Sequence, residues 1–91
     1  MNLIEPLVAW QDEIASIRRD LHAHPELGYE EIRTSNLVAT QLESWGVAVH
    51  RGLGKTGVVG VIQGRGTSTR AVGLRADMDA LPMQELNTFA H

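Results

Sequence analysis

The chain has 91 residues and a mass of 10.0 kDa, which allows one domain at most. Hydrophobic residues make up 43% of the sequence and charged residues 21%, values that exclude a disordered chain. The net charge of −3 argues against a nucleic-acid partner, since such proteins normally carry a basic patch. The absence of cysteine excludes disulfides, thiolate metal ligands and a thiol nucleophile within these residues.

Neither a membrane span nor a secretory signal is found in the sequence. No apolar run approaches the roughly 18 residues that a membrane helix needs. The first residues lack the basic region that opens a signal peptide. We therefore expect a cytoplasmic protein with no membrane partner.

Two helices are predicted in the first half of the chain. The first is amphipathic, because apolar residues three and four apart share one helical face: Leu3, Leu7, Trp10, Ile14, Ile17 and Leu21. Pro25 disfavours helical geometry at the preceding residue, so this helix should end by His24. The second helix should span residues 30–45, with Glu30 and Glu31 in its first turn and Gly46 after its end.

Three strands are predicted after the helices, at residues 47–50, 58–62 and 70–76. The middle run is continuously apolar apart from one glycine, which is typical of a strand buried on both faces. The connections are short and favour hairpins, because a parallel crossover needs about a dozen residues or more. The predicted fold class is α/β, with two N-terminal helices followed by three strands. A chain of this length buries a limited surface, so covering for the sheet is expected from elsewhere.

The glycine-rich segment at residues 52–57 invites comparison with a phosphate-binding loop. That motif requires a glycine five positions before its Gly-Lys pair, and Val49 stands there. The motif also leads directly into a helix, whereas a strand is predicted after Thr56. We therefore interpret the segment as a hairpin turn.

His22 and His24 admit two interpretations. Two imidazoles at a helix end can reach one metal ion, with Glu26 or Glu30 as a third ligand, although their spacing is not diagnostic. Alternatively, the imidazoles bond the last carbonyls of the first helix and fix the turn after it. The second interpretation is favoured.

Asp77 and Asp79 follow the third predicted strand, and residues two apart in a strand point the same way, roughly 6.6 Å apart. Paired carboxylates at a strand end need a nearby cation if they are buried. A metal ion, an imidazole or Arg75 are the candidates. The alternative is an exposed strand end at which Arg75 pairs locally, and spacing alone does not decide between them.

Two long motifs, at residues 22–31 and 73–82, resemble the N-terminal part of the hippurate hydrolase family. This family of N-acyl-amino-acid amidohydrolases includes the auxin-conjugate hydrolases and is similar to other co-catalytic metallopeptidases. The resemblance implies a longer α/β enzyme, whose catalytic domain has a central sheet and flanking helices and is interrupted by a dimerisation domain. Residues 1–91 would be an incomplete part of the catalytic domain. The enzyme would be a homodimer that hydrolyses the amide of small N-acyl-amino acids.

The resemblance also implies the metal chemistry. Two divalent ions, of the zinc or manganese class, would polarise the carbonyl and activate water, with a Glu as general base. The ligands would come from a Cys-Gly-His motif, a Glu and later His residues, none of them in this chain. Asp79 matches a supporting carboxylate that orients a ligating His. Asp77 stands where related enzymes have a metal-binding His, and is placed beside the site. His22 and His24 would be structural.

The resulting hypothesis is that this chain alone binds no metal and is inactive. One alternative is a small stand-alone binding or assembly module without catalysis, which should unfold cooperatively. Another is a small metal-binding protein that uses His22, His24, Asp77 and Asp79.

Overall fold

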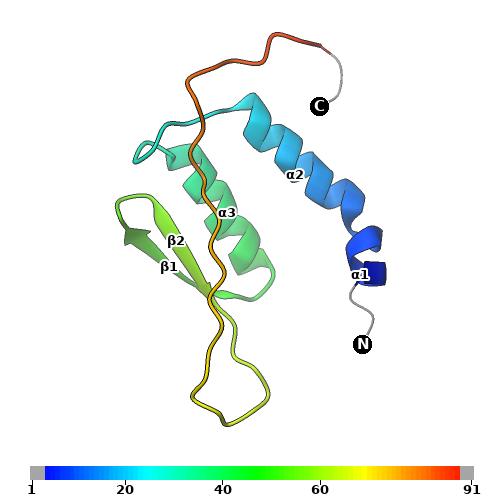
Figure 1. Cartoon of the computed structure of the whole chain (residues 1–91), viewed down its shortest axis with the longest axis vertical. Coiled ribbons are helices and arrows are strands. Elements are labelled where there is room, and N and C mark those ends of the chain that lie inside the picture. The colour runs from blue at the N-terminus through cyan, green and yellow to red at the C-terminus, as the bar shows by residue number, and fades with distance from the viewer. Residues whose placement is uncertain (1–3, 89–91) are drawn as a thin grey trace. The chain divides into compact units, whose positions relative to one another are not determined.

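The computed structural model describes residues 4–88, which form three helices and a two-stranded sheet (Figure 1). The mixed α/β class is therefore confirmed, whereas the number of strands is not. The chain divides into two compact units. One combines the chain up to Pro25 with the segment that begins at Pro82, and the other comprises Glu26–Leu81.

The first unit contains α1 (Ile4–Ala9) and α2 (Gln11–Ala23) in place of the single helix predicted there. The interruption is Trp10, whose N–H lies 3.2 Å from the carbonyl oxygens of both Pro6 and Leu7. Its ψ of 3° departs from helical geometry, which explains the break. The predicted end before His24 is confirmed, and Leu3 lies outside the described residues. Within residues 4–88, no helix is long and apolar enough to cross a membrane.

The apolar stripe of these two helices is largely open to solvent. Neither helix contains a buried residue, and Trp10 and Ile14 retain 55% and 50% of their accessible surface. The periodicity therefore identifies which face is apolar but does not say what covers it.

In the second unit, α3 (Ile32–Ser44) confirms the second predicted helix. It begins two residues later than predicted because the N–H of Ile32 donates to the Glu30 carbonyl at 2.8 Å, forming a turn before the helix. Its end has the expected glycine: Gly46 has φ +78° and donates to the Glu43 carbonyl at 3.0 Å. Such a left-handed residue satisfies carbonyls that the helix leaves unpaired.

The hairpin consists of β1 (Ala48–Leu53) and β2 (Gly57–Val61), which pair antiparallel as predicted. Strand β1 runs three residues further than the predicted end at residue 50. The pairing is irregular between Arg51 and Leu53, where Gly52 has φ +84°. A left-handed glycine at a bulge allows pairing to continue past the extra residue.

Helix α3 packs against this hairpin (Figure 1). The contact is close at Gly60 in β2, where an added Cβ would lie 3.0 Å from Val47 Cγ1 and 3.2 Å from Leu42 Cδ1. Ala39 of α3 is the buried hydrophobic residue of the described chain, with 2% of its surface exposed. The Arg51 guanidinium in β1 also donates hydrogen bonds to side chains of α3.

The third predicted strand is absent from the described residues. Residues 70–76 run as an extended segment without strand pairing, and Leu74 is 97% exposed. A strand requires a neighbour that accepts and donates its backbone hydrogen bonds, and the sequence pattern cannot supply one. Burial of both faces of β2 is likewise wrong, because Val59 and Val61 are partly exposed.

Candidate functional site

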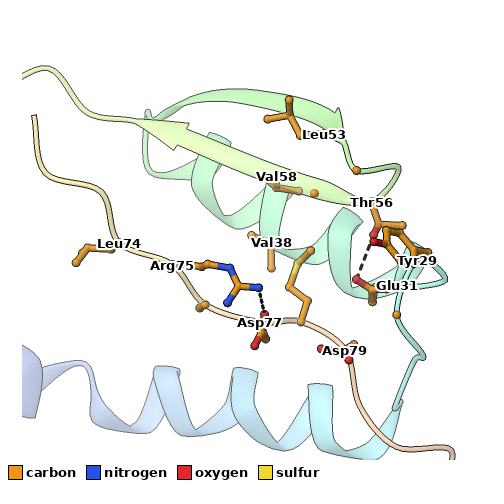
Figure 2. Close-up of a pocket in the computed structure, with 15 residues that line it drawn as sticks. Tyr29, Glu31, Val38, Leu53, Thr56, Val58, Leu74, Arg75, Asp77 and Asp79 are labelled. Carbon is orange, nitrogen blue, oxygen red and sulfur yellow. Dashed lines mark hydrogen bonds and ion pairs between the residues drawn. The ribbon is translucent and has the colours of Figure 1, made fainter.

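The second unit contains an open cavity of about 780 Å³ (Figure 2). Its walls come from the turn before α3, from the hairpin and from the extended segment at residues 74–79. The polar lining residues are Tyr29, Glu31, Thr56, Arg75, Asp77 and Asp79. Apolar side chains line it as well, including Val38, Leu53, Val58 and Met78. The cavity therefore combines an apolar wall with several ionisable groups.

The two motifs that are far apart in the sequence meet at this cavity. The N–H of Ala80 donates to the Glu26 carbonyl at 2.7 Å. Gly28 lies beside Asp79, since a Cβ on Gly28 would be 3.8 Å from Asp79 Oδ2. The structure thus brings Asp79 next to the turn that precedes α3.

Arg75 is the cation beside Asp77, the first of the two carboxylates. Its Nη2 lies 2.6 Å from Asp77 Oδ1, and the Arg75 and Asp77 side chains are 84% and 63% exposed. An ion pair this exposed contributes little to stability. The spacing left open a buried carboxylate pair with a cation and an exposed strand end with local pairing to Arg75. For Asp77 the structure shows the second, an exposed ion pair with Arg75.

The described residues do not fit a metal site on their own. Between residues 4 and 88, no three His, Asp or Glu side chains lie close enough together to share a metal ion. The available oxygen donors at the cavity include Asp77, which already pairs with Arg75, and Asp79. A structural zinc site normally has four ligands and a catalytic one three, so further ligands would be needed here.

The two histidines differ in their surroundings. His24 Nδ1 lies 2.9 Å from the Asp20 carbonyl oxygen and, in the tautomer protonated there, donates a hydrogen bond to it. His22 Nε2 is 3.8 Å from Glu85 Oε1. The helix-end interpretation is therefore confirmed for His24, whereas His22 faces an acidic side chain of the segment after Pro82.

Glu26 caps α3, a role that no local pattern in the sequence predicted. One carboxylate oxygen accepts a hydrogen bond from the Arg33 N–H at 2.9 Å and the other from the Thr34 N–H at 2.6 Å. Glu31, directly before the helix, makes no side-chain cap. Burial by itself would raise the pKa of Glu26, but hydrogen bonds from Thr34 and the Arg33 backbone, with the Arg33 charge, lower this pKa below its usual value.

Replacing Glu26 by Gln should lower the free energy of unfolding by roughly 1–2 kcal/mol at pH 7, as expected for loss of a helix cap. Folding lowers the pKa of Glu26 below its unfolded value near 4.5. The stabilisation from the ionised carboxylate is therefore fully present above pH 4.5, and it is lost as the pH falls through the lower pKa of the folded state. The difference in thermal midpoint between wild type and Glu26→Gln should therefore shrink in acid. Glu30→Gln removes the same charge from an exposed position, and a loss as large as that of Glu26→Gln would contradict the capping role.

Glu31 and Thr56 form a buried pair across the cavity wall. Glu31 Oε2 accepts a hydrogen bond from the Thr56 hydroxyl at 3.1 Å, and Oε1 accepts one from the Glu30 N–H at 3.1 Å. Only 7% of Glu31 and 6% of Thr56 are exposed. The expected place of Glu31 in the first helical turn is wrong, because it lies just before α3 and connects that turn to the hairpin.

The chain has close relatives among known proteins. It is 51% identical to "Hippurate hydrolase" of Campylobacter jejuni over 91 residues, which is 100% of this chain and 24% of that protein. It is 49% identical to "IAA-amino acid hydrolase ILR1-like 5" of Arabidopsis thaliana over 80 residues, 88% of this chain and 18% of the relative. It is 51% identical to "Thermostable carboxypeptidase 1" of Saccharolobus solfataricus over 76 residues, 82% of this chain and 19% of the relative. No protein-family model and no solved structure matches it.

By sequence the chain is thus related to a class of hydrolases. Within that class it is similar to the N-terminal segment of the hippurate hydrolase family, so the resemblance stated from the two motifs is confirmed. The chain spans about a quarter or less of the length of these relatives.

Proposed function

We propose that these residues are the N-terminal part of the catalytic domain of a longer, metal-dependent amidohydrolase. The enzyme hydrolyses the amide bond between an acyl group and an amino acid. The observation that carries this proposal is the 51% identity to hippurate hydrolase along all 91 residues, which include both motifs. The remainder of the catalytic domain and a dimerisation domain lie outside these residues, and the enzyme acts in the cytoplasm as a homodimer.

The proposed enzyme uses two divalent ions of the zinc or manganese class. Such ions polarise a carbonyl and activate water. Their ligands are a Cys-Gly-His motif, a Glu and later His residues of the longer protein, and within residues 4–88 no three ligating side chains lie together. Asp79 contributes by orienting a ligating His through its second ring nitrogen, as metal-supporting carboxylates commonly do. Asp77, held by Arg75, lies beside the site.

The cavity wall also provides a surface for binding the acyl group of the substrate. Its apolar side chains, Val38, Leu53, Val58 and Met78, offer a surface from which water is excluded when an apolar acyl group binds. The cavity is also lined by Arg75 and by the carboxylates of Glu31, Asp77 and Asp79. A lining of both kinds suits a substrate with an apolar acyl part and a charged amino-acid part.

The proposal is tested by incubating the longer protein with N-benzoyl-, N-acetyl- and N-indoleacetyl-amino acids and measuring the free amino acid. We expect release that a chelator abolishes and that added zinc or manganese restores. An enzyme that leaves every such amide intact would refute the proposed reaction. Release that survives complete metal removal would refute the metal dependence alone.

A further inference from the structure

Two residues other than glycine have positive φ in the described part of the chain, Tyr29 at 66° and Lys55 at 75°. The left-handed region is costly for residues with a Cβ, and least expected for a bulky side chain. Both residues lie in tight turns next to the cavity. Such residues persist only where the surrounding structure fixes them, and they tend to occur at functional sites.

Both turns are fixed by hydrogen bonds. Tyr29 lies in a turn closed by the Glu30 N–H, which donates to the Leu27 carbonyl at 2.9 Å. Lys55 is the central residue of a turn in which the Thr56 N–H donates to the Gly54 carbonyl at 3.0 Å. The buried Glu31–Thr56 hydrogen bond then joins the residues that follow these turns.

The side chains of these two residues meet at the edge of the cavity. Lys55 Nζ lies 5.8 Å from the centroid of the Tyr29 ring, within the range of a cation–π contact. Tyr29 itself lines the cavity (Figure 2). It is 68% exposed. The fold therefore holds the Tyr29 ring at the edge of the cavity, next to Thr56 and Glu31 (Figure 2), on a backbone of unfavourable φ, and leaves much of the residue uncovered.

We propose that Tyr29 is a specificity-determining residue that stacks against a flat apolar acyl group of the substrate. This inference rests on the proposed amidohydrolase function and names the acyl class that the site prefers. Offset stacking between aromatic rings adds to the burial of apolar area, so a ring in this place favours aromatic over small acyl groups. Glu31 and Thr56 are the positioning residues that fix the turn carrying the ring.

The test measures binding to the metal-depleted longer protein, in which hydrolysis is blocked, by titration calorimetry with N-benzoylglycine and N-acetylglycine. Tyr29→Leu should weaken N-benzoylglycine binding about three- to tenfold and leave N-acetylglycine binding unchanged. Tyr29→Phe keeps the ring and should retain the preference. Tyr29→Asn also removes the ring, and asparagine tolerates positive φ better than leucine does. It should therefore weaken N-benzoylglycine binding in the same way as Tyr29→Leu, with less backbone strain in the folded state.

The positioning pair is tested in the same assay. Thr56→Val removes the hydroxyl without changing the side-chain shape and should lower the preference for the benzoyl compound, whereas Thr56→Ser should keep it. If Tyr29→Leu and Tyr29→Asn weaken the binding of both compounds equally, or weaken neither, the inference is overturned. If the metal-loaded wild type releases glycine from neither compound, the proposed function is overturned. The ratio of the two dissociation constants, for N-benzoylglycine and N-acetylglycine, still decides the role of Tyr29.

Discussion

Asp79→Asn is expected to lower the kcat/KM of the longer protein for N-acyl-amino acids about 10- to 100-fold, the usual cost of removing a metal-supporting carboxylate. The amide keeps the size of the side chain but cannot accept a hydrogen bond from a ligating imidazole as strongly. The metal content of the purified variant should fall with its activity. Both quantities are measured on the same preparation, with added zinc or manganese varied.

The matched control for this variant is Asp12→Asn, which makes the same chemical change on the exposed surface of α2. Its kcat/KM should stay within about twofold of wild type, as expected for a surface change away from the site. A loss in Asp79→Asn that is no greater than in Asp12→Asn would remove Asp79 from the site. A loss of activity with full metal content would assign Asp79 another role.

Gly57→Ala is expected to have the largest effect on stability. A Cβ at this position would lie 2.2 Å from the Leu53 carbonyl oxygen and 3.1 Å from the Leu53 carbonyl carbon. The neighbour is backbone rather than a flexible side chain, so the first residue pair of the hairpin would have to separate. We expect the longer protein to lose roughly 1–3 kcal/mol, measured as a lower midpoint of chemical unfolding.

Gly64→Ala provides the comparison for Gly57→Ala. Nothing lies within 4 Å of a Cβ added at Gly64. This substitution should be neutral or slightly stabilising, because alanine restricts the unfolded chain more than glycine does. Equal midpoints for the two variants would show that the hairpin does not close at Gly57 as described.

Local signals in the sequence predicted the parts of the fold that depend on neighbouring residues. The end of α3 follows from Gly46, whose left-handed conformation few other residues adopt easily. The hairpin follows from short apolar runs separated by a glycine-rich turn. The prediction of a third strand was wrong because a strand at residues 70–76 depends on a pairing partner, and none is present in the described residues.

The site was predictable in part. The strand-end spacing singled out Asp77 and Asp79, and the structure places both at the cavity. The cap formed by Glu26 lies seven and eight residues before the amides that it bonds, too far for the usual capping pattern. The Glu31–Thr56 bond spans 25 residues, and no local pattern in either segment announces such a contact.

The exposed apolar side chains bear on the alternative of a stand-alone module. Val72 and Leu74 are 90% and 97% exposed, and the stripe on α1 and α2 is open as well. Large exposed apolar surfaces generally mark contact with other protein. This supports the proposal that further parts of a longer protein cover these residues.

The central claim, that this part of the protein shapes the site while the metal ligands come from elsewhere, is tested most directly by counting bound metal. Native mass spectrometry after equilibration with zinc or manganese is performed on the 91-residue chain and on the longer protein. The account predicts no bound ion on the 91-residue chain and two on the longer protein. About one ion on the 91-residue chain, or none on the longer protein, would contradict it.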